Sequence, residues 1–81
     1  MPIGIGIDSS DNIYVSDAAL NRIQKFDSNG NYLLQFGSAG SGNGQFNMPY
    51  SVIYDSNFIF VSDGMNSRVQ KFDLSGNYIS Q

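Results

Sequence analysis

A chain of 81 residues forms at most one small domain, and folding at this length buries only about 60 to 65% of the surface that the unfolded chain exposes. The chain has no cysteine and no histidine, which excludes disulfides, the usual zinc and haem ligands, and acid–base schemes based on imidazole. Seven acidic residues against four basic ones give a net charge of −3. We therefore expect no nucleic-acid partner, because no basic stripe can face a phosphate backbone, and no membrane partner, because no apolar run approaches the roughly 20 residues of a spanning helix.

The most informative feature of the sequence is an internal repeat. Pro2 and the pair Asp8-Ser9 recur 47 residues later as Pro49 and the pair Asp55-Ser56. One residue is then lost, so that the segment 13–17 (Ile-Tyr-Val-Ser-Asp) returns 46 residues later as 59–63 (Ile-Phe-Val-Ser-Asp). The segment 21–35 returns as 67–81 with nine of its fifteen residues identical. Two copies of one unit therefore account for most of the chain.

Each copy contains four segments rich in strand-forming residues, separated by Gly, Asn and Asp, which favour turns. The predicted strands are Ile3–Ile7, Ile13–Ser16, Arg22–Phe26 and Tyr32–Phe36 in the first copy, and Tyr50–Tyr54, Ile59–Ser62, Arg68–Phe72 and Tyr78–Ser80 in the second. Turns such as 27–31 (Asp-Ser-Asn-Gly-Asn) supply the positive φ of tight hairpins, so neighbouring strands should pair antiparallel. Units of this length with four antiparallel strands are typical of β-propeller blades, which predicts an all-β fold with two four-stranded antiparallel blades.

The chain then divides into a first blade at 1–35, a Gly/Ser-rich connector at 36–48 and a second blade at 49–81. Blades pack on both faces, so we expect the aromatic strand residues Tyr14, Phe26, Phe60 and Phe72 to lie in the core. The connector should be flexible in its Gly/Ser middle, with Phe46 packed against a blade.

Several short motifs, taken in order, resemble the NHL repeat. They are Pro-x-Gly-Ile-x-Ile-Asp at 2–8, Asn-Ile-Tyr-Val-Ser-Asp at 12–17, Asn-Arg-Ile-Gln-Lys-Phe-Asp at 21–27, Gly-Asn-Tyr-Leu at 30–33 and Gly-Gln-Phe-Asn-x-Pro at 44–49. The resemblance covers essentially the whole chain in two copies and implies a β-propeller, commonly with six blades. The sequence departs from the repeat in the shortened turn at 55–58, in the loop at 17–20 and at Ser51, where a glycine is usual.

Two blades leave two apolar blade faces uncovered, so we expect the chain to associate with itself. Head-to-tail contacts close into a ring only when the rotation per chain divides a full turn. Two blades per chain give rings of four, six or eight blades, and the resemblance favours six. The predicted assembly is therefore a homotrimer, in which the last blade of each chain packs on the first blade of the next.

Ten of the eleven charges occupy equivalent positions in the two copies, among them Asp17 with Asp63 and Arg22 with Arg68. A residue present twice at one blade position is explained more simply by the blade than by a single active site. Each aspartate ends a strand, where it can accept backbone N–H bonds, and each arginine can reach it or loop carbonyls. The alternative is a ring of carboxylates and guanidiniums that binds a small polar ligand.

No residue stands out as catalytic, cofactor-binding or metal-binding. The segment 8–12 (Asp-Ser-Ser-Asp-Asn) lacks the spaced glycine and closing glutamate of a calcium loop, so we expect an Asx-type turn. The serines have no candidate base.

The sequence thus favours a non-catalytic, self-assembling propeller scaffold or interaction module, without a cofactor, that binds itself and a protein or small polar ligand at the ring face. The alternative is a fragment of a propeller enzyme of lyase or hydrolase type with a ligand site in the central channel. RNA recognition is disfavoured by the charge.

Overall fold

The computed structural model describes residues 2–81, and residue 1 of the predicted first blade lies outside the described part. Residues 2–81 form eight strands and one short 3-10 helix, η1 (Gly64–Asn66), which confirms the predicted all-β class. No helix in this range is long and apolar enough to cross a membrane.

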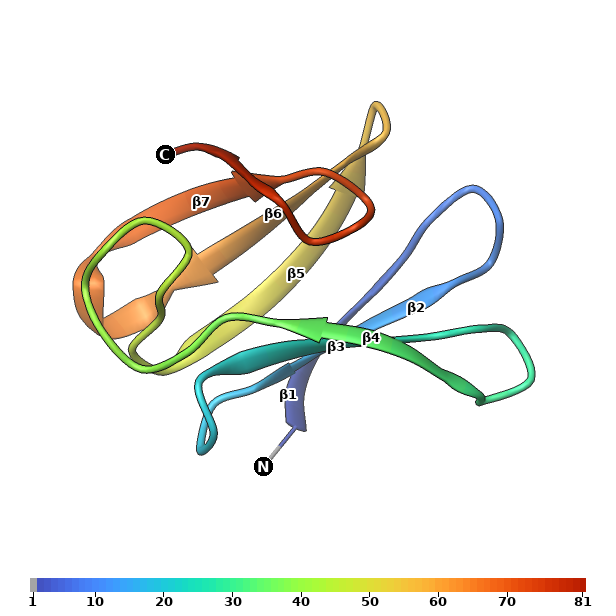
Figure 1. Ribbon diagram of the computed structural model, residues 1–81, viewed down its shortest axis with the longest axis horizontal. Helices are drawn as coiled ribbons and strands as arrows, with labels where there is room; N and C mark the ends of the chain where they lie inside the picture. Colours follow the sequence, from blue (N-terminus) through green and yellow to red (C-terminus); the bar gives the residue numbers. More distant parts are fainter. Residues whose placement is uncertain (1) are drawn as a thin grey trace.

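The strands form two four-stranded antiparallel sheets, each in simple sequential order. The first sheet contains β1 (Pro2–Ile7), β2 (Ile13–Asp17), β3 (Arg22–Phe26) and β4 (Tyr32–Phe36). The second sheet contains β5 (Pro49–Asp55), β6 (Phe58–Asp63), β7 (Arg68–Phe72) and β8 (Tyr78–Ser80). All eight predicted strands are present, and no strand end differs from its prediction by more than one residue. Figure 1 shows the two sheets joined by a wide loop, which is the connector.

Three turns share one arrangement, in which an aspartate binds the backbone of the residues that follow it. In the turn at 27–31, Asp27 Oδ1 accepts hydrogen bonds from the N–H groups of Asn29 and Asn31, both at 2.9 Å, and Asn31 Nδ2 donates to Asp27 Oδ2 at 3.1 Å. The turns at 8–12 and 73–77 repeat these contacts. The Asx-type turn predicted at 8–12 is therefore confirmed.

The turn between β5 and β6 has a different form. Ser56 and Asn57 have φ values of 53° and 69°, as the two central residues of a type I′ hairpin require. This tight loop pairs Asp55 directly with Phe58. As a result, β6 begins one residue earlier than the sequence predicts.

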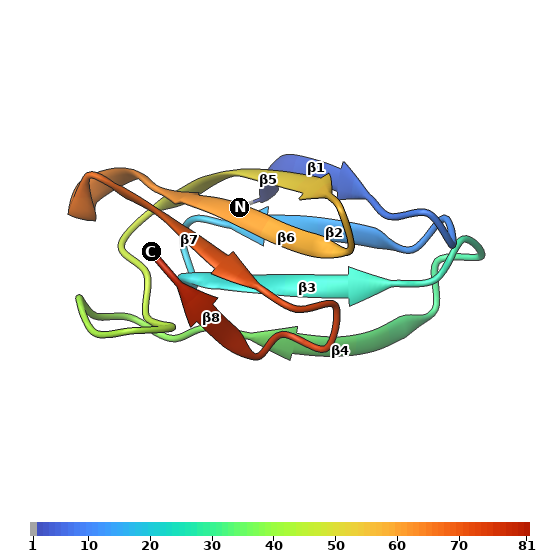
Figure 2. The same ribbon diagram turned by 90° about the horizontal axis from the view of Figure 1, so that it is seen from above.

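The two sheets stack face to face, and their first strands approach most closely. Figure 2 shows β1 beside β5 at one edge of the stack, with the strand order running in the same direction in both sheets. Gly4 and Gly6 lie at this contact. A Cβ atom at Gly6 would stand 2.7 Å from the carbonyl oxygen of Val52, and one at Gly4 would overlap the carbonyl oxygen of Tyr50. The two backbones are therefore as close as only glycine permits.

The hydrophobic core lies between the sheets and draws on both of them and on the connector. Its buried members are Tyr14, Ile23, Phe46, Val52, Ile59, Val61 and Phe72. The predicted burial of Tyr14 and Phe72 is confirmed. Phe26 and Phe60 are only partly buried, which corrects the prediction for these two residues. The reason is that side chains alternate across a strand, and these two rings point to the side of their sheet that faces away from the core.

Each sheet consequently has one outer face that carries apolar side chains. The outer face of the first sheet contains Ile5, Ile7, Val15 and Phe26, and the outer face of the second sheet contains Ile53, Phe60, Val69 and Lys71. Lys71 Nζ lies 4.0 Å from the ring centroid of Phe58 on the second of these faces.

Candidate functional site

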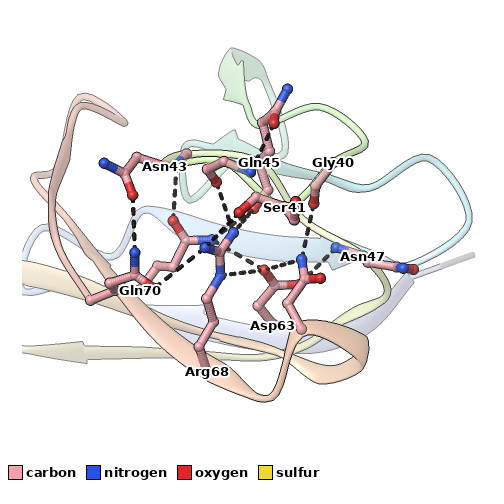
Figure 3. Close-up of polar contacts among 12 residues, drawn as sticks. Gly40, Ser41, Asn43, Gln45, Asn47, Asp63, Arg68 and Gln70 are labelled. Carbon is pink, nitrogen blue, oxygen red and sulfur yellow. Dashed lines mark hydrogen bonds and ion pairs between the residues drawn. The ribbon is translucent and has the colours of Figure 1, made fainter.

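Within residues 2–81, the side chains neither form a pocket nor bring three or more potential metal ligands together. The most extensive polar cluster lies where the connector crosses the second sheet (Figure 3). We call its three sheet residues, Asp63, Arg68 and Gln70, the connector cradle.

Strand register places the cradle residues on one face. Asp63 ends β6 and pairs with Arg68, which begins β7, while Gln70 pairs with Val61. Residues 68 and 70 therefore point to the same side of the sheet, toward the core. The side chains of Asp63 and Gln70 are fully buried, so each of their polar atoms needs a partner.

Asp63 is the centre of the cradle. Its Oδ1 accepts a hydrogen bond from the backbone N–H of Asn47 at 2.7 Å, and its Oδ2 accepts one from Arg68 Nε at 2.9 Å. Asn66 Nδ2 and Gln70 Nε2 also donate to Oδ2, at 2.9 and 3.2 Å. A buried carboxylate with this many donors is well satisfied, which offsets the cost of removing its charge from water.

Arg68 and Gln70 bind the connector backbone. The Arg68 guanidinium donates to the carbonyl oxygens of Ser41 at 2.9 Å and of Gly42 and Gln45 at 2.8 Å. Gln70 donates to Gln45 O at 2.7 Å and accepts from the N–H of Gly44 at 2.9 Å. The expectation of a flexible connector middle therefore needs correction, because these bonds hold the segment 40–47 against the sheet.

Phe46 anchors the connector from its apolar side. Its side chain is fully buried, and its ring centroid lies 5.6 Å from that of Phe72. Gly37 permits this position, since a Cβ there would overlap the Phe46 ring. The predicted packing of Phe46 against a blade is confirmed.

The first sheet carries the equivalent residues Asp17, Arg22 and Gln24 in a looser arrangement. Arg22 Nε lies 3.9 Å from Asp17 Oδ2, against 2.9 Å in the pair Arg68–Asp63. Asp17 Oδ1 accepts a hydrogen bond from Leu20 N at 3.3 Å, and Arg22 Nη1 donates to Gln35 Oε1 at 3.0 Å. Arg22 Nε is buried yet has no hydrogen-bond acceptor among residues 2–81. The four predicted site residues thus form one Asp–Arg pair in each sheet, and their structural role stays a prediction.

A second polar contact involves Asp8 and Tyr14 and occurs in the first repeat alone. The Tyr14 hydroxyl donates to Asp8 Oδ2 at 2.8 Å. Burial opposes ionisation of Asp8, but the hydrogen bonds from Tyr14, Asn12 and Ser10 outweigh it, so the pKa of Asp8 lies below its ordinary value. Burial and the neighbouring carboxylate raise the pKa of Tyr14. The second repeat has Phe60 at this position, together with the tight 55–58 turn.

Sequence reasoning missed Gln70, Gln45 and Asn47 as parts of the cluster. One signal was available for Gln70, because it recurs unchanged at Gln24 in the other repeat. No such signal marks Gln45 and Asn47, since the connector occurs once in the chain.

Two repeated four-stranded antiparallel sheets, stacked face to face with their first strands closest, are the arrangement of adjacent β-propeller blades. The sequence comparison agrees with this class, because residues 6–81 match the family DUF5128, described as a 6-bladed beta-propeller. The chain belongs to this family. No curated protein matches the chain.

Proposed function

We propose that this chain is a non-catalytic, self-assembling propeller module of two NHL-type repeats, and that three copies form one six-bladed ring. The main support for the proposal is a relation between faces of the two sheets. By the repeat, the outer face of the first sheet is equivalent to the inner face of the second sheet, and the outer face of the second sheet is equivalent to the inner face of the first. The partner for each outer face is then a second copy of the chain.

The burial of equivalent residues illustrates this relation. Ile5 is 67% exposed on the outer face of the first sheet, whereas its repeat equivalent Val52 is 4% exposed between the sheets. Val69 is 53% exposed on the outer face of the second sheet, whereas its equivalent Ile23 is fully buried. Stacking the second sheet of one copy on the first sheet of another would bury both exposed sets in the way that the chain buries their equivalents.

Polar contacts between the sheets also have counterparts on the outer faces. Ser16 Oγ donates to Tyr50 O at 2.7 Å, and Lys25 Nζ donates to Leu74 O at 2.8 Å. By repeat equivalence, Ser62 of one copy would donate to the carbonyl oxygen of Ile3 in the next. Lys71 would likewise donate to the carbonyl oxygen of Ser28.

The contact between copies would differ from the internal one at the first strands. Gly4 and Gly6 allow β1 to approach β5 closely, whereas the equivalent residues on the outer face are Ser51 and Ile53. Their side chains require more space between the backbones. The proposed ring therefore alternates three close junctions within chains with three wider seams between chains.

The non-catalytic part of the proposal is supported by what the charged groups contact. The cradle residues bind the chain's own connector backbone, and Asp27 and Asp73 bind their own turns. These charges serve contacts within the chain, with no pocket among residues 2–81 in which a substrate could be held. Stoichiometric binding of a divalent metal would instead favour the propeller-enzyme alternative, and a metal titration tests this.

An interface substitution tests the proposed assembly. Ile53→Asp places a charge on the outer face of the second sheet, where Ile53 is 58% exposed, so it should leave the fold intact and abolish the trimer. Met65→Asp is the matched control, because Met65 is 64% exposed but lies in the loop helix η1. Light scattering should find three copies for the control and one for Ile53→Asp. Equal masses for the two variants would contradict the proposed interface.

A further inference from the structure

The structure shows what an Asp–Arg–Gln set on this sheet can hold. In the second sheet, Asp63, Arg68 and Gln70 bind a glycine-rich segment through its backbone, and the binding needs no charged group in that segment. The first sheet carries the same three residue types at the same register positions, as Asp17, Arg22 and Gln24. Strand pairing is also the same, since Asp17 pairs with Arg22 as Asp63 pairs with Arg68.

We propose that Asp17, Arg22 and Gln24, with the adjoining outer face of the first sheet, form a binding site for a connector-like peptide supplied by another polypeptide. The peptide is an uncharged, glycine-rich run followed by Gln-Phe-Asn, as at 40–47 of this chain. The inference rests on the proposed function for its place at the seam between copies, and extends that function by naming a ligand.

Unused donors on Arg22 provide the first support. Arg68 donates through all three guanidinium nitrogens, to Asp63, Ser41, Gly42 and Gln45 as well as to Gln81. Arg22 makes the equivalent of the last bond, to Gln35, and its Nη atoms bind no backbone carbonyl oxygen among residues 2–81. The carbonyl oxygens of an extended peptide would accept hydrogen bonds from these Nη donors, as the connector carbonyls do from Arg68.

The second support is an apolar surface on which the phenylalanine of the peptide can pack. Phe46 packs in a core formed in part by Val52, Ile59, Val61 and Phe72. The equivalents in the first sheet are Ile5, Ile13, Val15 and Phe26, and all four are partly or largely exposed. A phenylalanine held beside Arg22 in the same register would cover these side chains, which supplies affinity that backbone hydrogen bonds alone would not.

The two sites differ at the position of Asn66 in the second sheet. Asn66 Nδ2 donates to Gly40 O and to Asp63 Oδ2, both at 2.9 Å, but its equivalent in the first sheet is Leu20, which is 57% exposed. The first-sheet site therefore lacks one of the donors that fix the peptide. Leu20→Asn should restore this donor and strengthen binding.

The probe is a synthetic peptide of residues 37–48 with blocked ends and a fluorescent label, titrated into the 81-residue chain. We expect saturable binding of one peptide per chain, about tenfold weaker for Arg22→Lys, which keeps the charge but loses the planar fork of donors. Leu20→Asn should bind about three- to tenfold more tightly. Phe46→Ala in the peptide should weaken binding at least tenfold.

A scrambled peptide of the same composition is the matched control and should not saturate. Amide NMR shifts should change around Ile5, Arg22 and Gln24 rather than at Asp63 and Arg68, which already hold the connector. Absence of saturable binding, equal binding of the scrambled peptide, or unchanged affinity in both the Arg22→Lys and Leu20→Asn variants would overturn the inference. Peptide binding by a chain that remains a monomer would contradict the proposed ring but support this site, whereas a trimer that ignores the peptide would do the reverse.

Discussion

At the scale of single residues, the same Asp–Arg pair occurs in both repeats but has a different geometry in each. Asp63 and Arg68 are in direct contact at 2.9 Å and bind the connector, while the nearest Asp17–Arg22 approach is 3.9 Å. Asp63 is fully buried and has four hydrogen-bond donors around it. The same residue types thus stabilise the fold to different degrees, because the contribution of an ion pair depends on its burial and its other partners.

Asp63→Asn should therefore lower the free energy of unfolding by about 3 kcal/mol, since it removes one member of a buried ion pair and leaves Arg68 uncompensated. Asp17→Asn should cost about 1 kcal/mol, as expected for a longer and more exposed pair. Urea denaturation of the two variants measures the difference. Equal decreases in the free energy of unfolding would show that the additional contacts of the connector cradle do not stabilise the fold.

Acid should destabilise the fold through three turn aspartates. Hydrogen bonds from Asn31 and Asn29 lower the pKa of Asp27, those from Asn77, Ser75 and Gly76 lower the pKa of Asp73, and the pKa of Asp8 is also lowered. In the unfolded chain these groups return toward 3.8. At a pH between the folded-state and unfolded-state pKa values, the unfolded chain binds more protons than the folded chain. Stability therefore falls as the pH drops below about 4 and is retained above it.

Thermal melting between pH 5 and pH 2 checks this sign. The melting temperature should decrease over that range, and Asp73→Asn should show a smaller decrease than the unchanged chain. A melting temperature that is constant from pH 5 to pH 2 would contradict the role given to these carboxylates.

At the scale of elements, the same turn occurs in two different environments. Gly30 and Gly76 occupy the same position with φ values of 84° and 87°. A Cβ at Gly30 would meet no atom within 4 Å, whereas one at Gly76 would stand 2.6 Å from the Phe36 ring. Phe36 belongs to the first sheet and packs on Phe72 of the second, with ring centroids 4.9 Å apart. The 73–77 turn therefore takes part in the packing between sheets.

The two glycines form a matched pair of substitutions. Gly30→Ala should cost about 1 kcal/mol, from the positive φ alone. Gly76→Ala should cost about 1 to 3 kcal/mol more, because the added methyl group also displaces Phe36. Chemical denaturation of both variants gives the difference directly, and equal costs would show that Phe36 does not pack on this turn as described.

Local signals in the sequence determined the strands well. Turn residues and strand-forming segments act over a few positions, so β3, β4, β7 and β8 were predicted to the residue. The ordered connector could not be predicted in this way, since it depends on Arg68 and Gln70, more than 20 residues from the groups that they bind. Phe26 and Phe72 occupy equivalent positions in the two repeats, but only Phe72 lies between the two sheets. The sequence of the repeat does not show this difference. A repeat predicts the shape of a unit but not which of its faces is covered.

At the scale of the whole molecule, the chain has a buried junction between its sheets and two outer faces equivalent to the sides of that junction. The proposed ring of copies would cover both faces, and the family that the chain belongs to is described as a 6-bladed beta-propeller. The seams are expected to be wider than the internal junction, because Ser51 and Ile53 replace Gly4 and Gly6. The assembly should therefore dissociate on dilution before the individual chains unfold.

The six-bladed ring is best tested by the mass of the 81-residue chain in solution, measured by light scattering over a range of concentrations. One chain has a mass of 8.9 kDa. The proposed ring requires a mass of three chains at micromolar concentration. A folded monomer at that concentration, or a stable assembly of two or four chains, would contradict the proposed six-bladed ring.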